Sequence, residues 1–139
     1  MATGKMNWTR VIVCGLLTGV AWTVLSALST WFLGADFNAA VGGNKIFAPT
    51  AGLFAFLFTL NLLGGIWAIW LYAAIRPHYG PGAKTAVIVG FAWWFVSSLA
   101  DWTWVSLGFV PVTAFIPLSA IAVPELIVAT FVGAWLYKE

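Results

Sequence analysis

Two carboxylates interrupt long apolar runs and are the residues of this sequence best suited to chemistry. Asp101 and Glu125 are the only charged residues between Thr85 and Tyr137. A charge in an apolar, membrane-spanning helix is costly, so such residues usually face the protein interior, a cavity or a partner. Two neighbouring carboxylates raise each other's pKa, which lets them share a proton, or they jointly attract a cation. The pair therefore predicts a proton or cation site, if the fold brings the two together.

Whether they meet depends on where the last helix begins. If it begins at Pro117, both acids lie about 10 to 12 Å below the same membrane edge, because a helix rises about 1.5 Å per residue. If it begins nearer Pro111, Glu125 lies at the middle of the membrane and the pairing weakens. The candidate ligand or proton site also includes the residues that precede Asp101 in the same run: Trp93, Trp94 and Ser97. The competing interpretation is that both acids are structural polar groups near the interface.

The elements that must position these residues are membrane spans. The chain has 139 residues, of which 63% are apolar and 7% charged, whereas soluble domains carry about 25% charged residues. A bilayer core requires about 20 apolar residues per helix. The expected fold is all-α, a transmembrane four-helix bundle forming a single domain over residues 1–139, with spans near 10–33, 49–75, 84–107 and 115–137. Pro49 and Pro117 suit a first helical turn, and Pro77 is expected to end the second span at Arg76.

Basic residues predict the orientation of these spans. Lys45 alone falls in the first or third loop, and all the others lie at the N-terminus, in the second loop or at the C-terminus: Lys5, Arg10, Arg76, Lys84 and Lys138. Loops rich in Lys and Arg remain cytoplasmic. We therefore expect both termini in the cytoplasm. The first apolar run is longer than the core of a signal peptide, which has about 7 to 15 residues, so we expect it to remain in the mature chain.

The sequence also contains an internal similarity. At an offset of 71, the first and third spans share six identical residues, beginning with Gly19 and Gly90 and including Trp22 and Trp93. At an offset of 65, Trp70-Leu71-Tyr72 matches Trp135-Leu136-Tyr137. This pattern predicts two duplicated helical hairpins related by a pseudo-two-fold axis along the membrane normal. Shared apolar composition is the alternative explanation.

Small and hydroxyl residues mark the faces on which helices approach one another. Such residues let helices pack closely and form hydrogen bonds across the gap. Trp22, Ser26 and Ser29 or Thr30 follow a helical spacing that predicts a protein-facing stripe. The expected helix-packing residues are Gly15, Gly19, Ser26, Asn61, Gly64 and Gly65.

The sequence lacks the residues that a disulfide, a metal centre or an enzyme active site requires. Cys14 is the only cysteine and His78 the only histidine, so neither a disulfide nor a metal centre is expected. No nucleophile stands beside a base, and no phosphate-binding glycine loop is present, so we expect neither an enzyme nor a bound cofactor. Six scattered basic residues do not predict nucleic-acid binding.

The segment from Leu71 to Ala86, LYAAIRPHYGPGAKTA, resembles a loop in small four-span bacterial membrane proteins that carry no assigned function. The resemblance covers this loop and, more loosely, the layout of the spans. It implies a bacterial inner-membrane protein and transfers no functional residue.

Two functions compete on this basis. The first is a structural or accessory membrane protein that contacts lipids and forms a homo-oligomer or joins other membrane subunits, since one small bundle buries little interior by itself. The second is a small proton- or cation-linked transporter, or a lipophilic-ligand-binding protein, that uses Asp101 and Glu125.

Overall fold

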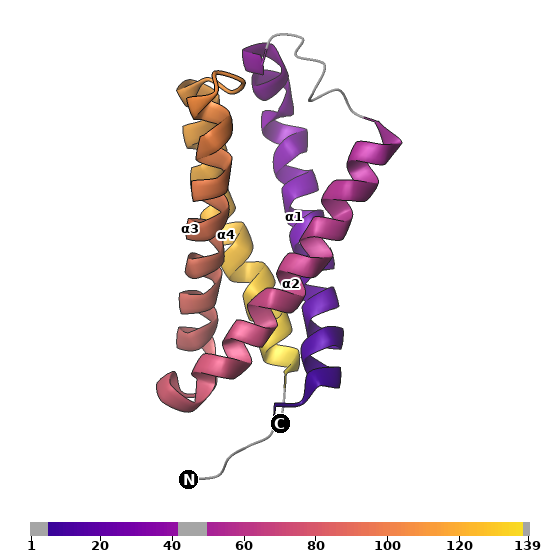
Figure 1. Ribbon diagram of the computed structural model, residues 1–139, viewed down its shortest axis with the longest axis vertical. Coiled ribbons are helices and arrows are strands. Elements are labelled where there is room, and N and C mark those ends of the chain that lie inside the picture. The colour runs from indigo at the N-terminus through magenta and orange to yellow at the C-terminus, as the bar shows by residue number, and fades with distance from the viewer. Residues whose placement is uncertain (1–5, 42–49, 138–139) are drawn as a thin grey trace.

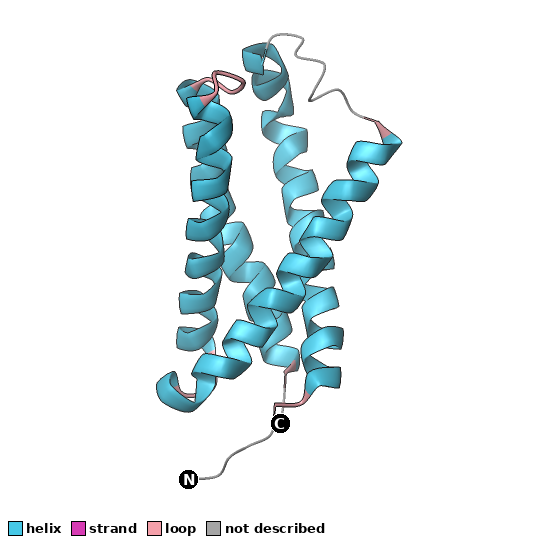
Figure 2. Cartoon of the chain, viewed as in Figure 1, coloured by secondary structure: helices cyan, strands magenta, loops and turns pink. Residues whose placement is uncertain are grey.

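Four long helices form the molecule. The computed structural model describes residues 6–41 and 50–137, and within these ranges the chain forms helices without strands (Figure 2). The helices are α1 (Trp8–Val41), α2 (Ala51–Tyr79), α3 (Ala83–Ser106) and α4 (Val112–Leu136). They run alternately up and down, so the start of α1, the α2–α3 link and the end of α4 share one end of the molecule (Figure 1). We call this the termini end and the opposite one the far end. The predicted all-α four-helix architecture is confirmed.

Each helix is long and apolar enough to cross a bilayer. In lipid the backbone has no water to bond with, and a continuous helix satisfies its N–H and C=O groups within the segment. The protein is therefore a multi-pass integral membrane protein. Its connections between α2 and α3 and between α3 and α4 are short (Figure 1).

Glycine makes the tight link between α2 and α3 possible. Gly80 and Gly82 have positive φ angles of 84° and 118°, a region that residues with a side chain rarely adopt. The Gly80 N–H donates to the Arg76 carbonyl at 2.9 Å and ends α2. The Gly82 N–H donates to the Tyr72 hydroxyl at 3.0 Å, which fastens the link to the body of α2.

Several predicted helix ends are wrong, although all four spans exist. The helix α2 continues past Pro77 to Tyr79, because a proline in the last turn removes only one backbone bond and Gly80 supplies the cap. Thr50 caps its start by accepting from the Leu53 N–H at 3.1 Å. Pro49, which was expected there, lies outside the described residues.

The two outer helices also differ from the prediction. The helix α4 begins at Val112, after Pro111, so Pro117 lies inside it rather than at its start. The helix α1 extends to Val41, beyond the expected end near residue 33. Its last turns contain alanines at positions 39 and 40, and alanine has the strongest intrinsic helix propensity.

Glycines let α1 and α2 pack backbone to backbone. A Cβ atom on Gly19 would lie 2.6 Å from the Cα of Leu62, and a Cβ on Gly15 would collide with the backbone of Ile66. From the other side, a Cβ on Gly65 would collide with the backbone of both α1 glycines. Close approach replaces the hydrophobic driving force that is absent between helices in lipid. These three glycines are among the residues expected to pack helices together, and they lie at this close contact.

The second hairpin packs in the same register as the first. A Cβ on Gly90 would lie 2.6 Å from the Cα of Ile127. Gly90 corresponds to Gly19 by the offset of 71, and Ile127 corresponds to Leu62 by the offset of 65. The same offsets relate buried positions: Cys14, Gly15, Thr18 and Gly19 to Thr85, Ala86, Val89 and Gly90, and Gly65, Ala68, Ile69 and Tyr72 to Thr130, Gly133, Ala134 and Tyr137. Each hairpin thus presents the same face to the core.

Residues that correspond between the hairpins also meet in the core. Trp22 and Trp93 pack edge to face with ring centroids 4.8 Å apart. Tyr72 and Tyr137 do likewise at 6.1 Å. The hairpins approach closely where a Cβ on Gly133 would lie 3.0 Å from the Cys14 carbonyl oxygen.

The core occupies the half of the molecule nearer the termini end. Toward the far end α2 diverges from α3 and α4 (Figure 1), and large apolar side chains of α1 and α2 are exposed. Trp31 is 85% exposed and Phe32 78%. On α2 the exposed set consists of Phe54, Phe56, Leu57 and Leu60. In a membrane these side chains face lipid or a partner.

Candidate functional site

Glu125 lies at the contact between α4 and α1. Ser29 of α1 donates its hydroxyl hydrogen to Oε1 of Glu125, and the same hydroxyl lies 3.3 Å from the Leu25 carbonyl oxygen of its own helix. Glu125 is half-buried, and Ser29 is its only hydrogen-bond partner among the described residues. The position of Ser29 agrees with the stripe predicted from Trp22, whereas Thr30, the alternative, is exposed and bonds to the Ser26 carbonyl.

An apolar groove opens beside this pair. Its volume is about 330 Å³, and its lining combines the two polar residues with six apolar ones: Leu25, Leu28, Phe32, Ile121, Pro124 and Val128. No Lys, Arg or His lines it. The carboxylate is therefore the only group in the groove that can carry a charge.

The depth of Glu125 follows from the observed start of α4. Glu125 lies 13 residues after Val112 in a helix of 25 residues, which places it about 20 Å from the far end of the helix at about 1.5 Å per residue. It is thus near the middle of the span. A carboxylate at this depth has no water around it and must be bonded, neutral or matched by a cation.

Asp101 does not join Glu125. The helices α3 and α4 are aligned by three contacts, which pair Gly90 with Ile127, Ser98 with Ser119 and Trp102 with Phe115. In this alignment Ala92 is level with Glu125, and Asp101 lies nine residues away, or about 13 Å along the helix. The pairing was expected with a start of α4 at Pro117 and expected to weaken with a start nearer Pro111. The helix begins at Val112, and the alignment separates the two carboxylates.

Asp101 is exposed on the surface of α3. It has no hydrogen bond to any described residue. The stripe of Trp93, Ser97 and Asp101 starts in the core and leaves it, because each step of four residues turns a helix by about 40° beyond a full circle. Trp93 is buried, Ser97 half-buried and Asp101 exposed.

A second polar cluster joins α3 to α4 and was not predicted. The indole N–H of Trp94 donates to the Ser119 carbonyl at 2.8 Å, and the hydroxyls of Ser98 and Ser119 lie 3.0 Å apart. Trp94 therefore has a structural partner, and Ser98, rather than its neighbour Ser97, forms the hydroxyl contact with α4. Serines at adjacent positions 97 and 98 look alike in sequence, and only the helix phase separates them.

The expected packing residues divide into two kinds. Asn61 donates its side-chain N–H to the Thr23 hydroxyl at 3.0 Å and links α2 to α1, and a Cβ on Gly64 would collide with the ring of Trp93. Ser26 instead bonds to the Thr23 carbonyl of its own helix at 3.2 Å. Thr23, which is not among the expected packing residues, supplies the hydroxyl that bonds across the two helices.

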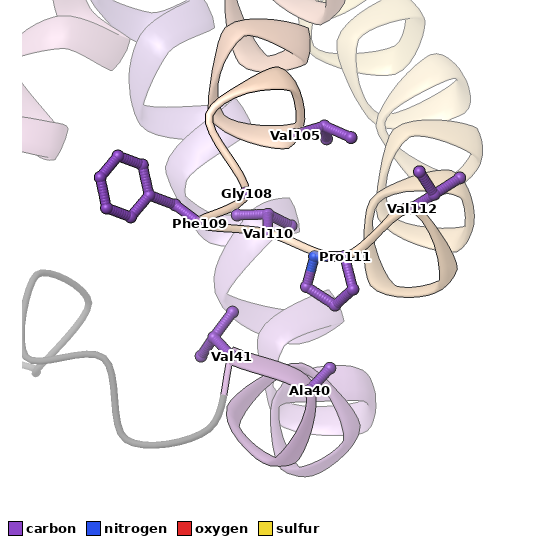
Figure 3. A pocket seen from close by; sticks show the side chains of 8 residues that line it. All are labelled: Ala40, Val41, Val105, Gly108, Phe109, Val110, Pro111 and Val112. Carbon is purple, nitrogen blue, oxygen red and sulfur yellow. The ribbon is translucent and has the colours of Figure 1, made fainter.

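A further pocket, at the far end, has no reactive or charged side chain in its lining. Figure 3 shows its lining by the end of α1 and the loop before α4, and its volume is about 400 Å³. The lining residues carry no polar side chain: Ala40, Val41, Val105, Gly108, Phe109, Val110, Pro111 and Val112. Across residues 6–41 and 50–137, no group of three His, Cys, Asp or Glu side chains could hold a metal ion.

Comparison with known proteins identifies no relative. No family model matches the chain, no curated protein matches it, and no solved structure matches it.

Proposed function

We propose that the protein acts by lateral association in the bilayer, as a structural or accessory protein that forms a homo-oligomer or joins other membrane subunits. The observation that carries this proposal is the exposed carboxylate of Asp101. It lies five residues before the end of α3 at Ser106, about 8 Å inside the helix end. A partner that supplies a donor or a cation at this level removes the cost of facing lipid.

The surface around Asp101 suits a helix–helix contact. Ser97 and Ala100 are small residues on the same helix, and Trp102 and Trp104 are partly exposed beside them at 46% and 41%. Small residues permit close approach, and aromatic residues are enriched at the centres of interfaces. Toward the far end, where Asp101 lies on α3, the helix α2 diverges from α3 (Figure 1).

Energy transfer between labelled copies in liposomes tests the homo-oligomer. Donor and acceptor dyes are attached at His78→Cys in a Cys14→Ala background, and the protein-to-lipid ratio is varied. We expect parent copies to associate and Asp101→Leu to weaken the association at least tenfold, while Glu125→Gln leaves it unchanged. Transfer no greater than that of randomly distributed monomers at every ratio would rule out the homo-oligomer.

The orientation that we propose places the termini end in the cytoplasm. Three basic residues of the described chain lie at that end: Arg10, Arg76 and Lys84. Short segments rich in Lys and Arg remain cytoplasmic. The acidic residue Asp36 lies toward the opposite, far end. Lys5, Lys45 and Lys138 lie outside the described residues. The bacterial inner membrane is the proposed location, on the resemblance of the loop from Leu71 to Ala86.

We also propose that the two hairpins arose by duplication. The offsets of 71 and 65 support this proposal. They relate identical residues, buried positions and the two glycine contacts, Gly19 with Leu62 and Gly90 with Ile127. Equivalent residues that touch each other, as Trp22 and Trp93 do, are expected beside a two-fold axis.

A further inference from the structure

We propose that the groove between α1 and α4 binds the cationic head of a lipophilic amine, with Glu125 as counter-ion and Ser29 as the group that orients the carboxylate. This inference does not depend on lateral association. The groove contains one carboxylate and no basic side chain, so no group in the groove balances the charge of the ionised carboxylate. An ammonium group supplies the missing positive charge.

The rest of the groove selects an apolar ligand. The side chains around the carboxylate are aliphatic or aromatic, and the site lies near the middle of the span. A strongly hydrated metal ion would lose its water there without gaining enough oxygen ligands. A lipophilic amine instead reaches the groove through the bilayer and keeps its chain among apolar side chains.

The size of the groove limits the ligand. Its volume of about 330 Å³ is at the lower end of the range of about 300 to 1,000 Å³ for ligand sites. The groove therefore accepts an alkylammonium head and the first part of its chain, and the remaining chain extends into lipid.

The alternative explanation is that Ser29 and Glu125 only hold α1 against α4. One observation argues against the need for such a clasp. These helices already meet closely where Gly133 packs against Thr18 and Cys14. By the offsets of 71 and 65, the positions equivalent to Ser29 and Glu125 are Ala100 and Leu60, and both are exposed. There α2 diverges from α3 (Figure 1), so these two positions form no matching contact.

The experiment measures binding of radiolabelled octyltrimethylammonium to the full chain in lipid nanodiscs, with empty nanodiscs as background. We expect saturable binding to the parent, competed by octylammonium but not by octanol, which has the same chain without the charge. Glu125→Gln should bind at least tenfold more weakly. Asp36→Asn is the matched control, because it removes an exposed carboxylate outside the groove, and it should bind like the parent.

Two further measurements keep the result decisive. Ser29→Ala retains the carboxylate and should weaken binding by a smaller factor than Glu125→Gln, and circular dichroism establishes that every variant is folded. If Glu125→Gln is unfolded, Ser29→Ala and octanol competition decide the question. Equal binding to the parent and empty nanodiscs, equal binding to the parent and a folded Glu125→Gln variant, or competition by octanol as strong as by octylammonium would each overturn the proposal.

Discussion

Trp22 of α1 and Trp93 of α3 pack edge to face, with ring centroids 4.8 Å apart. They belong to different hairpins and occupy equivalent positions, 71 residues apart. Edge-to-face packing brings the positive ring edge of one indole to the negative face of the other. The contact therefore joins the two hairpins through one pair of matched residues.

The first prediction concerns this contact. In a double-mutant cycle, Trp22→Ala and Trp93→Ala should show a coupling of about 0.5 to 1.5 kcal/mol in the free energy of unfolding. Unfolding in mixed micelles with increasing SDS measures it. Trp31→Ala is the control, because Trp31 is 85% exposed and should not couple with Trp93. Purely additive losses for Trp22 and Trp93 would contradict a direct contact.

The second prediction concerns the glycine contact within the first hairpin. Gly65→Ala should destabilise the protein by about 1 to 3 kcal/mol, because the added methyl group collides with the α1 backbone. Gly52→Ala makes the same change in the same helix, but its Cβ would lie 4.0 Å from the Thr50 hydroxyl, its nearest neighbour. We expect that control to be neutral or stabilising. Similar melting temperatures for both variants would contradict the packing.

The third prediction uses the shared register of the two hairpins. Gly19→Ala and Gly90→Ala each place a methyl group against the partner backbone, at Leu62 and Ile127, with the same 2.6 Å separation from Cα. Both should therefore cost about 1 to 3 kcal/mol of unfolding free energy. A large cost for one variant and none for the other, measured in the same micelles, would show that the two contacts are not equivalent.

The fourth prediction tests the orientation of the chain. In a Cys14→Ala background, cysteines at His78 and at Asp36 lie near opposite ends of the molecule. A membrane-impermeant maleimide added to intact cells should label Asp36→Cys, and His78→Cys should react only after the cells are opened. The reverse pattern would place the termini end outside and would refute the assignment from basic residues.

The sequence predicts the elements of this fold better than its candidate site. Long apolar runs identify all four helices, because backbone in lipid has few alternatives to helix. Helix ends are harder to predict, since Pro77 and Pro117 lie inside helices that continue past them. The glycine contacts could be anticipated because small residues have few other uses at such spacing.

The site depended on quantities that spacing alone does not define. A start of α4 at Pro117 would have placed Asp101 and Glu125 at the same depth. The helix begins five residues earlier, at Val112, and the two acids lie at different depths. The phase of α3 then decides that Ser98 bonds to Ser119 while Asp101 is exposed. The actual partner of Glu125 is Ser29, which comes from the other hairpin, 96 positions earlier. No local pattern contains that information.

The concentration of the core toward the termini end has a consequence for the surrounding lipid. The buried side chains lie mainly in the half nearer the termini end, whereas in the far half of α1 and α2 Phe54, Phe56 and Trp31 are at least 60% exposed. Where no partner covers these three side chains, acyl chains of the leaflet at the far end pack against them. The stability of the protein should consequently respond more strongly to the chain length and saturation of that leaflet than to those of the other.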